Sequence, residues 1–318
     1  MRILTERCID VNSAYCPCML AEMNHCVMCS QLQGGANCIC EWSGTCVLYE
    51  KLWQGSARPQ KAKRIEEITR FSAAVAVGEK TIAASFSVSQ ELARLLDKAG
   101  AFVFLRRADD EQFYHFPVGV MAVDGIVVTV AIEAVGTKSK RFLRDTSAEI
   151  VVRGPYYNGL FGQPWLTALK KERALLLAGG IGQAPSLAVA KELVRGGNDI
   201  TAILAGGKVG RIFAGEELRR MGVEVVEVSS MRRDGIPLLR KILKKGVDFI
   251  ASCGSDNQHC GIIAILNEME LNLPMAATNN AVMCCGEGIC GSCHQKMADG
   301  RVVKLCKVQA DFRQLEQD

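Results

Sequence analysis

The most constraining feature of this 318-residue sequence is its 15 cysteines, most of which lie in two groups near the ends of the chain. The C-terminal group has a Cys-x4-Cys-x2-Cys spacing with a fourth cysteine further on, and its members are Cys285, Cys290, Cys293 and Cys306. This is the plant-type spacing of a [2Fe–2S] ligand set. The neighbouring Gly286, Gly288 and Gly291 suit a loop that wraps tightly around a cluster. A zinc site would more often show paired CxxC knuckles. We therefore predict a [2Fe–2S] cluster within residues 273–318.

The N-terminal group has eight cysteines, which are Cys8, Cys16, Cys18, Cys26, Cys29, Cys38, Cys40 and Cys46. Eight thiolates are the complement of two clusters with four ligands each, so residues 1–60 are predicted to bind one or two [4Fe–4S] clusters. Structural zinc is the alternative, because four-cysteine sites with CxxC also hold zinc. The segment has too few apolar residues to form a core alone, and a bound metal would stabilise it.

The composition limits the class of protein. Hydrophobic residues make up 49% and charged residues 23%, which favours folded domains. The net charge of +4 is too small to indicate nucleic acid as the main partner. We expect no secretory signal peptide and no transmembrane segment, because no long apolar run occurs. These features predict a cytoplasmic protein, in which dense cysteine indicates metal binding rather than disulfides.

The hydrophobic pattern of the middle of the chain changes near residue 160. Residues 61–160 contain closely spaced strand-like runs such as FSAAVAV and GIVVTVAIEAV, which predict a small β-barrel. Residues 161–272 alternate short apolar runs with helix-length segments at Ala184–Arg195, Ala214–Met221, Ile236–Lys245 and His259–Met269. This alternation predicts a parallel sheet with helices on both faces. The expected fold class is therefore α/β plus all-β, with a Cys-rich segment at each end.

A Gly-rich turn, AGGIGQAP, directly follows the first apolar run of the α/β region. Such a turn from strand into helix places backbone N–H groups against a pyrophosphate. The next strand ends in AGGKVGR, whose Lys208 and Arg211 would meet a ribose phosphate and favour NADP(H) over NAD(H), unless both are solvated surface charges. The last strand ends in SCGS, where Cys253 either faces a nicotinamide or is a plain buried thiol. The predicted nucleotide-binding residues are Gly179, Gly180, Gly182, Pro185, Lys208, Arg211, Cys253 and Gly254.

These signals, together with the turns GTKSK and GPYYNG, resemble a known family over about residues 65–312. It is the ferredoxin-reductase-like electron-transfer subunits, especially that of NAD-dependent dihydroorotate dehydrogenase. The small subunits of electron-bifurcating NADH-dependent reduced ferredoxin:NADP oxidoreductase look equally similar. The resemblance implies an FAD-binding barrel, an NAD(P)-binding α/β domain and a C-terminal [2Fe–2S] loop. The simple dihydroorotate subunit lacks the N-terminal Cys-rich segment.

The flavin motif departs from the family pattern. Where the family has RPIS or RxYS, this chain has HFPVGV, in which the Arg is absent and Gly119 stands at the Ser position. The backbone amide of Val118 or Gly119 could still meet the flavin ring, and a helix N-terminus at Thr137 could hold its pyrophosphate. The FAD-binding residues implied by the resemblance are Pro117, Val118, Gly119, Gly136, Thr137 and Lys138.

The cofactors predict the chemistry. Nicotinamide transfers a hydride, iron–sulfur clusters accept single electrons, and a flavin does both. We expect an electron-transfer subunit of an oxidoreductase complex with no catalytic side chain of its own, working with other subunits and with ferredoxin as a candidate partner, in an electron-bifurcating NADH/ferredoxin/NADP reaction. The alternatives are a dihydroorotate or sulfide dehydrogenase subunit, and a non-catalytic iron–sulfur or zinc docking subunit with a decayed flavin site.

Overall fold

The computed structural model describes residues 7–10, 13, 15, 64–288 and 290–316. These residues form two compact units: Ile65–Asn280 with Asp311–Arg313 make the first, and the other described residues make the second. The cysteines from Cys16 to Cys46 lie outside the described residues, so the [4Fe–4S] clusters and their zinc alternative stay predictions.

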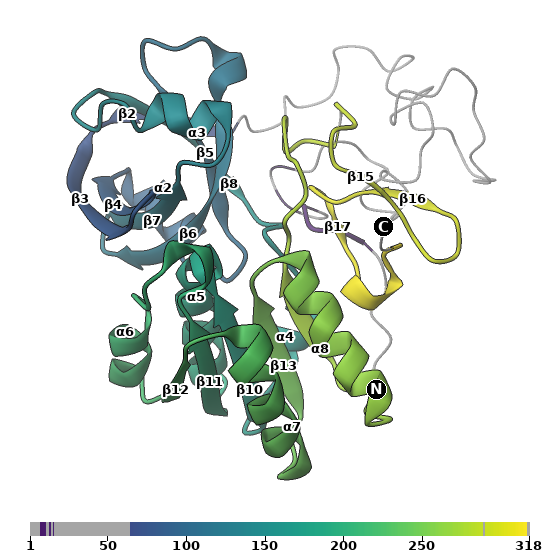
Figure 1. Cartoon of the computed structure of the whole chain (residues 1–318). Coiled ribbons are helices and arrows are strands. Elements are labelled where there is room, and N and C mark those ends of the chain that lie inside the picture. The colour runs from purple at the N-terminus through teal and green to yellow at the C-terminus, as the bar shows by residue number, and fades with distance from the viewer. Residues whose placement is uncertain (1–6, 11–12, 14, 16–63, 289, 317–318) are drawn as a thin grey trace. The chain divides into compact units, whose positions relative to one another are not determined.

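The first half of unit 1 is an antiparallel half-barrel, as the strand-like runs predict (Figure 1). Its strands, in sheet order, are β2 (Ile65–Thr69), β8 (Ile150–Tyr156), β5 (Phe102–Arg107), β6 (Phe116–Asp124), β7 (Val127–Glu133), β4 (Thr81–Ser87) and β3 (Phe71–Gly78). Two short helices accompany them, α2 (Gln90–Leu96) and α3 (Thr137–Phe142). Ser89 caps α2 by accepting a hydrogen bond from the Leu92 amide, and Leu92 and Leu96 then enter the barrel core.

The second half of unit 1 is a six-stranded sheet that corrects one expectation. In sheet order its strands are β12 (Glu224–Val228), β11 (Asp199–Ala205), β10 (Arg173–Gly179), β13 (Phe249–Cys253), β14 (Met275–Thr278) and β9 (Leu160–Phe161). The first five are parallel, but β9 pairs antiparallel with β14, so the sheet is mixed rather than purely parallel. A two-residue edge strand carries no periodic pattern, which is why the sequence does not predict it.

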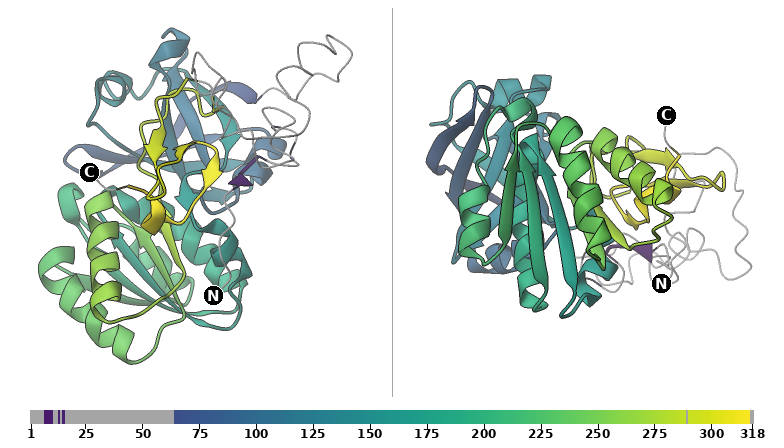
Figure 2. Two further views of the ribbon diagram at one scale, coloured as in Figure 1. Left: turned by 90° about the vertical axis from the view of Figure 1, so that its right-hand side faces the viewer. Right: turned by 60° about the horizontal axis from the view of Figure 1, so that its bottom comes forward.

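Helices cover both faces of this sheet, as expected. They are α4 (Gln163–Ala168), α5 (Gln183–Arg195), α6 (Gly215–Arg220), α7 (Ile236–Lys244) and α8 (Asp256–Glu268). Buried residues of α4, α5 and α6 pack with Leu176, Ala202 and Leu204 in one cluster. Leu175 and Ile203 are equally buried but belong to the opposite face of their strands, where α7 and α8 lie (Figure 1). The right-hand view of Figure 2 shows the strands side by side beneath their helices.

Unit 2 contains two small antiparallel ribbons in its described part. Strand β1 (Arg7–Cys8) pairs with β17 (Val308–Gln309), and β15 (His294–Lys296) pairs with β16 (Val302–Lys304). Residues from both ends of the chain thus share one β-ribbon. Within the part of the chain that the structure describes, no helix is long and apolar enough to span a bilayer.

Candidate functional site

A cleft of about 1200 Å³ lies in unit 1 at the carboxyl ends of the parallel strands. This edge is where open α/β sheets bind nucleotides. Gly179 ends β10, Gly180 and Ile181 follow it, Gly207 and Lys208 follow β11, and all five line the cleft. Further lining residues follow the other parallel strands: Ser229, Ser230 and Arg232 after β12, Gly254, Ser255 and Asp256 after β13, and Asn280 after β14. The cleft therefore gathers the ends of all five parallel strands around one space.

Glycine is required at the turns that form the floor of this cleft. Gly180 has φ 58° and Gly207 has φ 53°, in the left-handed region that glycine tolerates best. A Cβ on Gly207 would lie 2.8 Å from the amide nitrogen of Gly180, so the two turns are in close contact. A Cβ on Gly182 would lie 2.2 Å from the carbonyl oxygen of Cys253. The predicted Gly182 is therefore a packing residue that lets α5 approach β13, and it does not itself line the cleft. Pro185 also lies outside the lining.

Gln183 joins these turns and was not predicted as a site residue. Its side chain is fully buried and its amide group donates to the carbonyl oxygens of Gly180 and Arg211 at 3.2 and 2.9 Å. Its carbonyl oxygen accepts from the Phe213 amide at 2.8 Å. One buried side chain thus fixes the loop after β10 to the loop after β11. These contacts join loops that are distant in the sequence, so no sequence signal identifies Gln183 as a site residue.

The basic residues of the cleft differ from the predicted pair. Lys208 lines the cleft, but Arg211, which follows Gly210 in the same loop, does not. Arg232 lines the cleft instead, together with Ser229 and Ser230 at the end of β12. Two cationic side chains and two serines therefore line the part of the cleft that would receive a ribose phosphate.

Cys253 does not face the cleft. Its side chain is fully buried in the core of the six-stranded sheet, and burial raises the pKa of its thiol to about 12. The structure therefore places it as a plain buried thiol rather than as a group beside a nicotinamide. The following residue, Gly254, does line the cleft.

A buried hydrogen-bond network holds the end of β13 beside the cleft. The imidazole of His259, which lies in α8, is 2.7 Å from Ser252 Oγ through Nδ1 and 3.1 Å from the Thr278 carbonyl oxygen through Nε2. Because a carbonyl only accepts, Nε2 donates and Nδ1 accepts the Ser252 hydroxyl proton. Burial lowers the pKa of His259 to about 4, so the ring is neutral near pH 7. Thr278 Oγ1 in turn accepts from the Gly254 amide at 3.0 Å.

The two stretches implied to bind a flavin lie next to each other in the half-barrel. Lys138 Nζ, in the first turn of α3, donates to the carbonyl oxygen of His115 at 3.1 Å, directly before β6. Pro117 and Gly119 are exposed on β6, and a Cβ on Gly119 would meet no atom within 4 Å. Gly136 is the N-cap of α3, where its amide donates to Ser139 Oγ at 3.2 Å.

The residues of this region can be compared with what FAD binding requires. Open space beside Gly119 and exposed backbone at 136–137 suit a flavin and its phosphates. Val118 is buried, so only its backbone is available. The GPYYNG stretch contributes packing: Tyr156 is buried and its ring stacks on Phe102 with centroids 5.2 Å apart. The residues present therefore fit the group, although the Arg of the family motif is absent.

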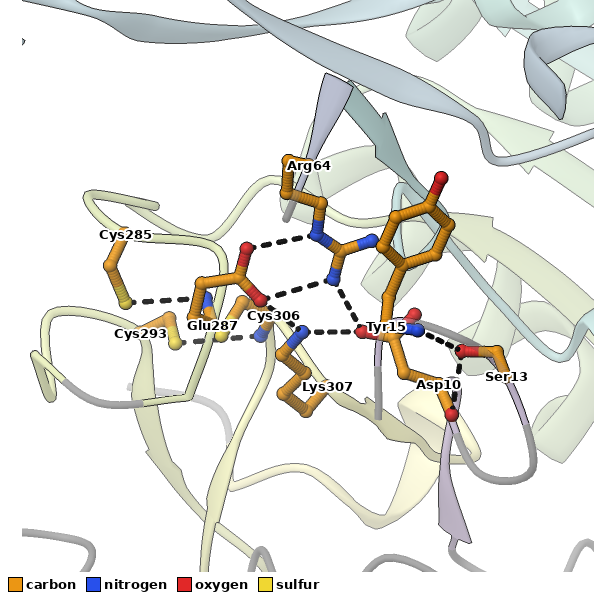
Figure 3. Close-up of polar contacts among 9 residues, drawn as sticks. All are labelled: Asp10, Ser13, Tyr15, Arg64, Cys285, Glu287, Cys293, Cys306 and Lys307. Atoms are coloured by element: carbon orange, nitrogen blue, oxygen red, sulfur yellow. Dashed lines mark hydrogen bonds and ion pairs between the residues drawn. The ribbon is translucent and has the colours of Figure 1, made fainter. Parts of the chain in front are cut away.

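The C-terminal cysteine loop lies wholly in unit 2. Gly286, Gly288 and Gly291 have φ angles of 68°, 73° and 78°, as expected for a tightly wrapped loop. Figure 3 shows Cys285, Cys293 and Cys306 near Glu287. The amide of Glu287 donates to Cys285 Sγ at 3.3 Å and that of Cys306 to Cys293 Sγ at 3.4 Å.

The fourth cysteine of the predicted set is Cys290. Cys290 is exposed, and its Sγ atom lies 3.2 Å from Ser292 Oγ. Among the described residues, no three Cys, His, Asp or Glu side chains form a group arranged to hold a metal ion. The donor chemistry, the glycine conformations and the N–H···S contacts fit a [2Fe–2S] cluster, which stays a prediction. Cys8 is buried on β1, opposite Val308, and is therefore close in space to the C-terminal segment.

Comparison with known proteins gives relatives of one kind. No protein-family model matches the chain. The chain is 28% identical over 198 residues to a probable dihydroorotate dehydrogenase B (NAD(+)) electron transfer subunit of Methanopyrus kandleri, covering 60% of this chain and 71% of the relative. It is 27% identical to the corresponding subunit of Streptococcus pneumoniae, covering 68% and 85%.

Solved structures support the same fold. The structure of NADH-dependent reduced ferredoxin-NADP oxidoreductase aligns with a TM-score of 0.62 at 19% identity, covering 79% of this chain and 90% of that chain. A ferredoxin NADP+ reductase from Neisseria gonorrhoeae, with bound FAD and NADP, aligns with a TM-score of 0.52 at 16% identity, covering 69% and 99%. The resemblance to ferredoxin-reductase-like proteins is confirmed. The chain is thus similar in sequence to the electron-transfer subunits of dihydroorotate dehydrogenase B, and its fold is that of the ferredoxin reductases.

Proposed function

We propose that this chain is an electron-transfer subunit that carries electrons between NAD(P)H, FAD and a [2Fe–2S] cluster. The observation that carries the proposal is the cleft at the carboxyl edge of the six-stranded sheet, whose lining includes both Gly-rich turns and Glu133 from the end of β7. A nucleotide seated there would meet residues of both the α/β sheet and the half-barrel. Relatives named as electron transfer subunits support the same function.

The chain's own residues would act by binding and orienting. The turns at Gly179–Ile181 would hold the pyrophosphate through backbone N–H groups. Gly119, Gly136 and Thr137 would seat FAD, and Cys285, Cys290, Cys293 and Cys306 would ligate the cluster. When bound, the flavin supplies the exchange between two-electron and one-electron chemistry. No side chain needs to act as a general acid or base.

We further propose that the chain works in a multi-subunit oxidoreductase. Its relatives are named as subunits, and the structural neighbour with the higher TM-score of the two is described in connection with electron bifurcation. A bifurcating NADH/ferredoxin/NADP reaction and a dihydroorotate or sulfide dehydrogenase reaction are both consistent with this chain. The partner subunit and the final acceptor distinguish them.

A cofactor analysis of the anaerobically purified chain tests the proposal. We expect about one flavin per chain, together with iron and acid-labile sulfide, and reduction of an artificial dye by NADH or NADPH. The second candidate function is that of an iron–sulfur docking subunit, and the absence of the flavin-motif Arg before Pro117 favours it. A flavin content near zero with iron retained would support this candidate. A chain that contains zinc and no iron would refute electron transfer to a cluster in this chain.

A further inference from the structure

Four charged side chains in unit 2 form a closed ring of alternating sign beside the cysteine loop (Figure 3). Arg64 donates to Asp10 Oδ2 at 2.7 Å and to Glu287 Oε1 at 2.9 Å. Lys307 Nζ completes the ring, at 2.5 Å from Asp10 Oδ2 and 3.1 Å from Glu287 Oε2. The ring therefore contains two cations and two carboxylates, and its formal charge is zero.

The charged ring is buried, so its balance matters. The side chains of Asp10 and Lys307 are each 1% exposed, that of Arg64 is 6% exposed and that of Glu287 is 26% exposed. The ring of Tyr15 lies over the Arg64 guanidinium at 4.4 Å. Burial alone would raise the pKa of Glu287, but Arg64 and Lys307 hold it below its usual value. Removing one member would leave an unpaired charge in a poorly solvated place.

The ring joins the two ends of the chain at the cysteine loop. Glu287 lies two residues after Cys285, and its amide donates to that sulfur. Lys307 follows Cys306 directly in the sequence, and its carbonyl oxygen accepts from the Ile9 amide at 2.7 Å. Asp10 and Arg64 come from the N-terminal part of the chain. Half of the charges in the ring are therefore supplied by a part of the sequence far from the cysteine loop.

We propose that Asp10, Arg64, Glu287 and Lys307 are positioning residues for the cysteine loop, and that their charge balance sets the reduction potential of the cluster bound there. The inference rests on the [2Fe–2S] cluster of the proposed function. Reduction adds one electron to the cluster. A nearby cation therefore favours the reduced cluster, and a nearby carboxylate disfavours it. With all four charges present the opposing contributions offset each other. The N-terminal segment thus takes part in setting the properties of the C-terminal cluster.

Matched single and paired substitutions in the full chain test this role. The measurement is an EPR-monitored redox titration of the [2Fe–2S] signal, with iron and sulfide determined per chain. We expect Glu287→Gln to shift the oxidised–reduced equilibrium about ten-fold toward the reduced cluster, and Lys307→Met to shift it about ten-fold the other way, each equivalent to about 59 mV for one electron. Asp10→Asn and Arg64→Met should show the same two signs. The neutral pair Glu287→Gln with Lys307→Met should return the equilibrium to near that of the wild type.

The exposed ion pair between Lys296 and Glu316 provides the control in the same unit. Lys296→Met and Glu316→Gln should leave the potential unchanged, because solvent screens exposed charges. Single variants that lose the cluster while the neutral pair keeps it would also support the proposal. Unchanged potentials, shifts that do not follow the sign of the charge, or loss of the cluster from single and paired variants alike would overturn it. A wild-type chain without any [2Fe–2S] signal would refute the proposed function, and this inference with it.

Discussion

At the scale of single residues, the structure revises which cations would recognise a nucleotide. The sequence analysis pairs Lys208 with Arg211 because both lie in AGGKVGR, the turn that follows the second strand of the α/β region. The structure brings Lys208 into the cleft with Arg232, which follows a different strand. Residues that meet at the carboxyl edge of a parallel sheet come from separate βα turns, so spacing along one loop could not identify the pair.

The revised pair gives a prediction for cofactor preference. Lys208→Ala with Arg232→Ala should lower the ratio of kcat/KM for NADPH over NADH about ten-fold or more, because each charge-assisted contact to a 2′-phosphate is lost. Arg211→Ala is the matched control and should leave the ratio unchanged, since this side chain does not line the cleft. Steady-state dye reduction with both nucleotides measures it. A wild type that uses both nucleotides equally, or a control that loses as much as the pair, would contradict the prediction.

At the scale of elements, the turn between β10 and α5 depends on a glycine, Gly182, at a position where a side chain would not fit. Gly182→Ala would place a Cβ 2.2 Å from the Cys253 carbonyl oxygen, a backbone atom that has little freedom to move. We expect a loss of about 1–3 kcal/mol in the free energy of unfolding and weaker nucleotide binding.

Gly261 is the control for that substitution, because it lies within α8 at the cleft and a Cβ there meets nothing within 4 Å. Gly261→Ala should stabilise the protein by about 0.5–1 kcal/mol, since alanine favours a helix interior. Denaturant unfolding of both variants measures the difference. Equal effects of the two substitutions would show that the close approach at Gly182 is unimportant.

The buried His259 predicts an acid-sensitive α8. Burial lowers the pKa of His259 to about 4, and the negative charge of the nearby Asp256 opposes this shift only in part. The unfolded chain binds a proton at about pH 6.5 while the folded chain does not, so stability present above pH 6.5 is lost as the pH falls toward 4. From pH 7 to pH 5 we expect a loss of about 2 kcal/mol attributable to this residue. The His259→Gln variant should lack that part of the pH dependence, and an unchanged slope would contradict the assignment.

Most elements of unit 1 could be predicted from periodic patterns. The expected helix Ala184–Arg195 is found at Gln183–Arg195, and Ile236–Lys245 at Ile236–Lys244. The start of α8 is earlier than expected, at Asp256 rather than His259, because its first turn is polar and carries no apolar repeat. Gln183 and the charged ring could not be predicted, since both depend on contacts between distant segments.

At the scale of the whole molecule, the proposed function is that of a chain that carries electrons between partners. An electron carrier is useful only when a donor and an acceptor both reach it. We expect the isolated chain to reduce artificial dyes with NAD(P)H but to lack the native reaction, which returns when the other subunits are added. Size-exclusion chromatography and activity assays of native material test this. A native preparation that is monomeric and fully active would contradict it.

In the proposed function, electrons from a nicotinamide reach the cluster in the Cys285–Cys306 loop. The most direct test is to mix the anaerobic, full-length chain with NADPH or NADH, to follow flavin absorbance, and to freeze samples for EPR. We predict flavin bleaching followed by a [2Fe–2S] signal. Cys290→Ser should remove that signal, and Cys284→Ser, at an exposed cysteine outside the ligand set, should preserve it. Flavin bleaching without any [2Fe–2S] signal in the wild type, or a signal that survives in Cys290→Ser, would contradict it.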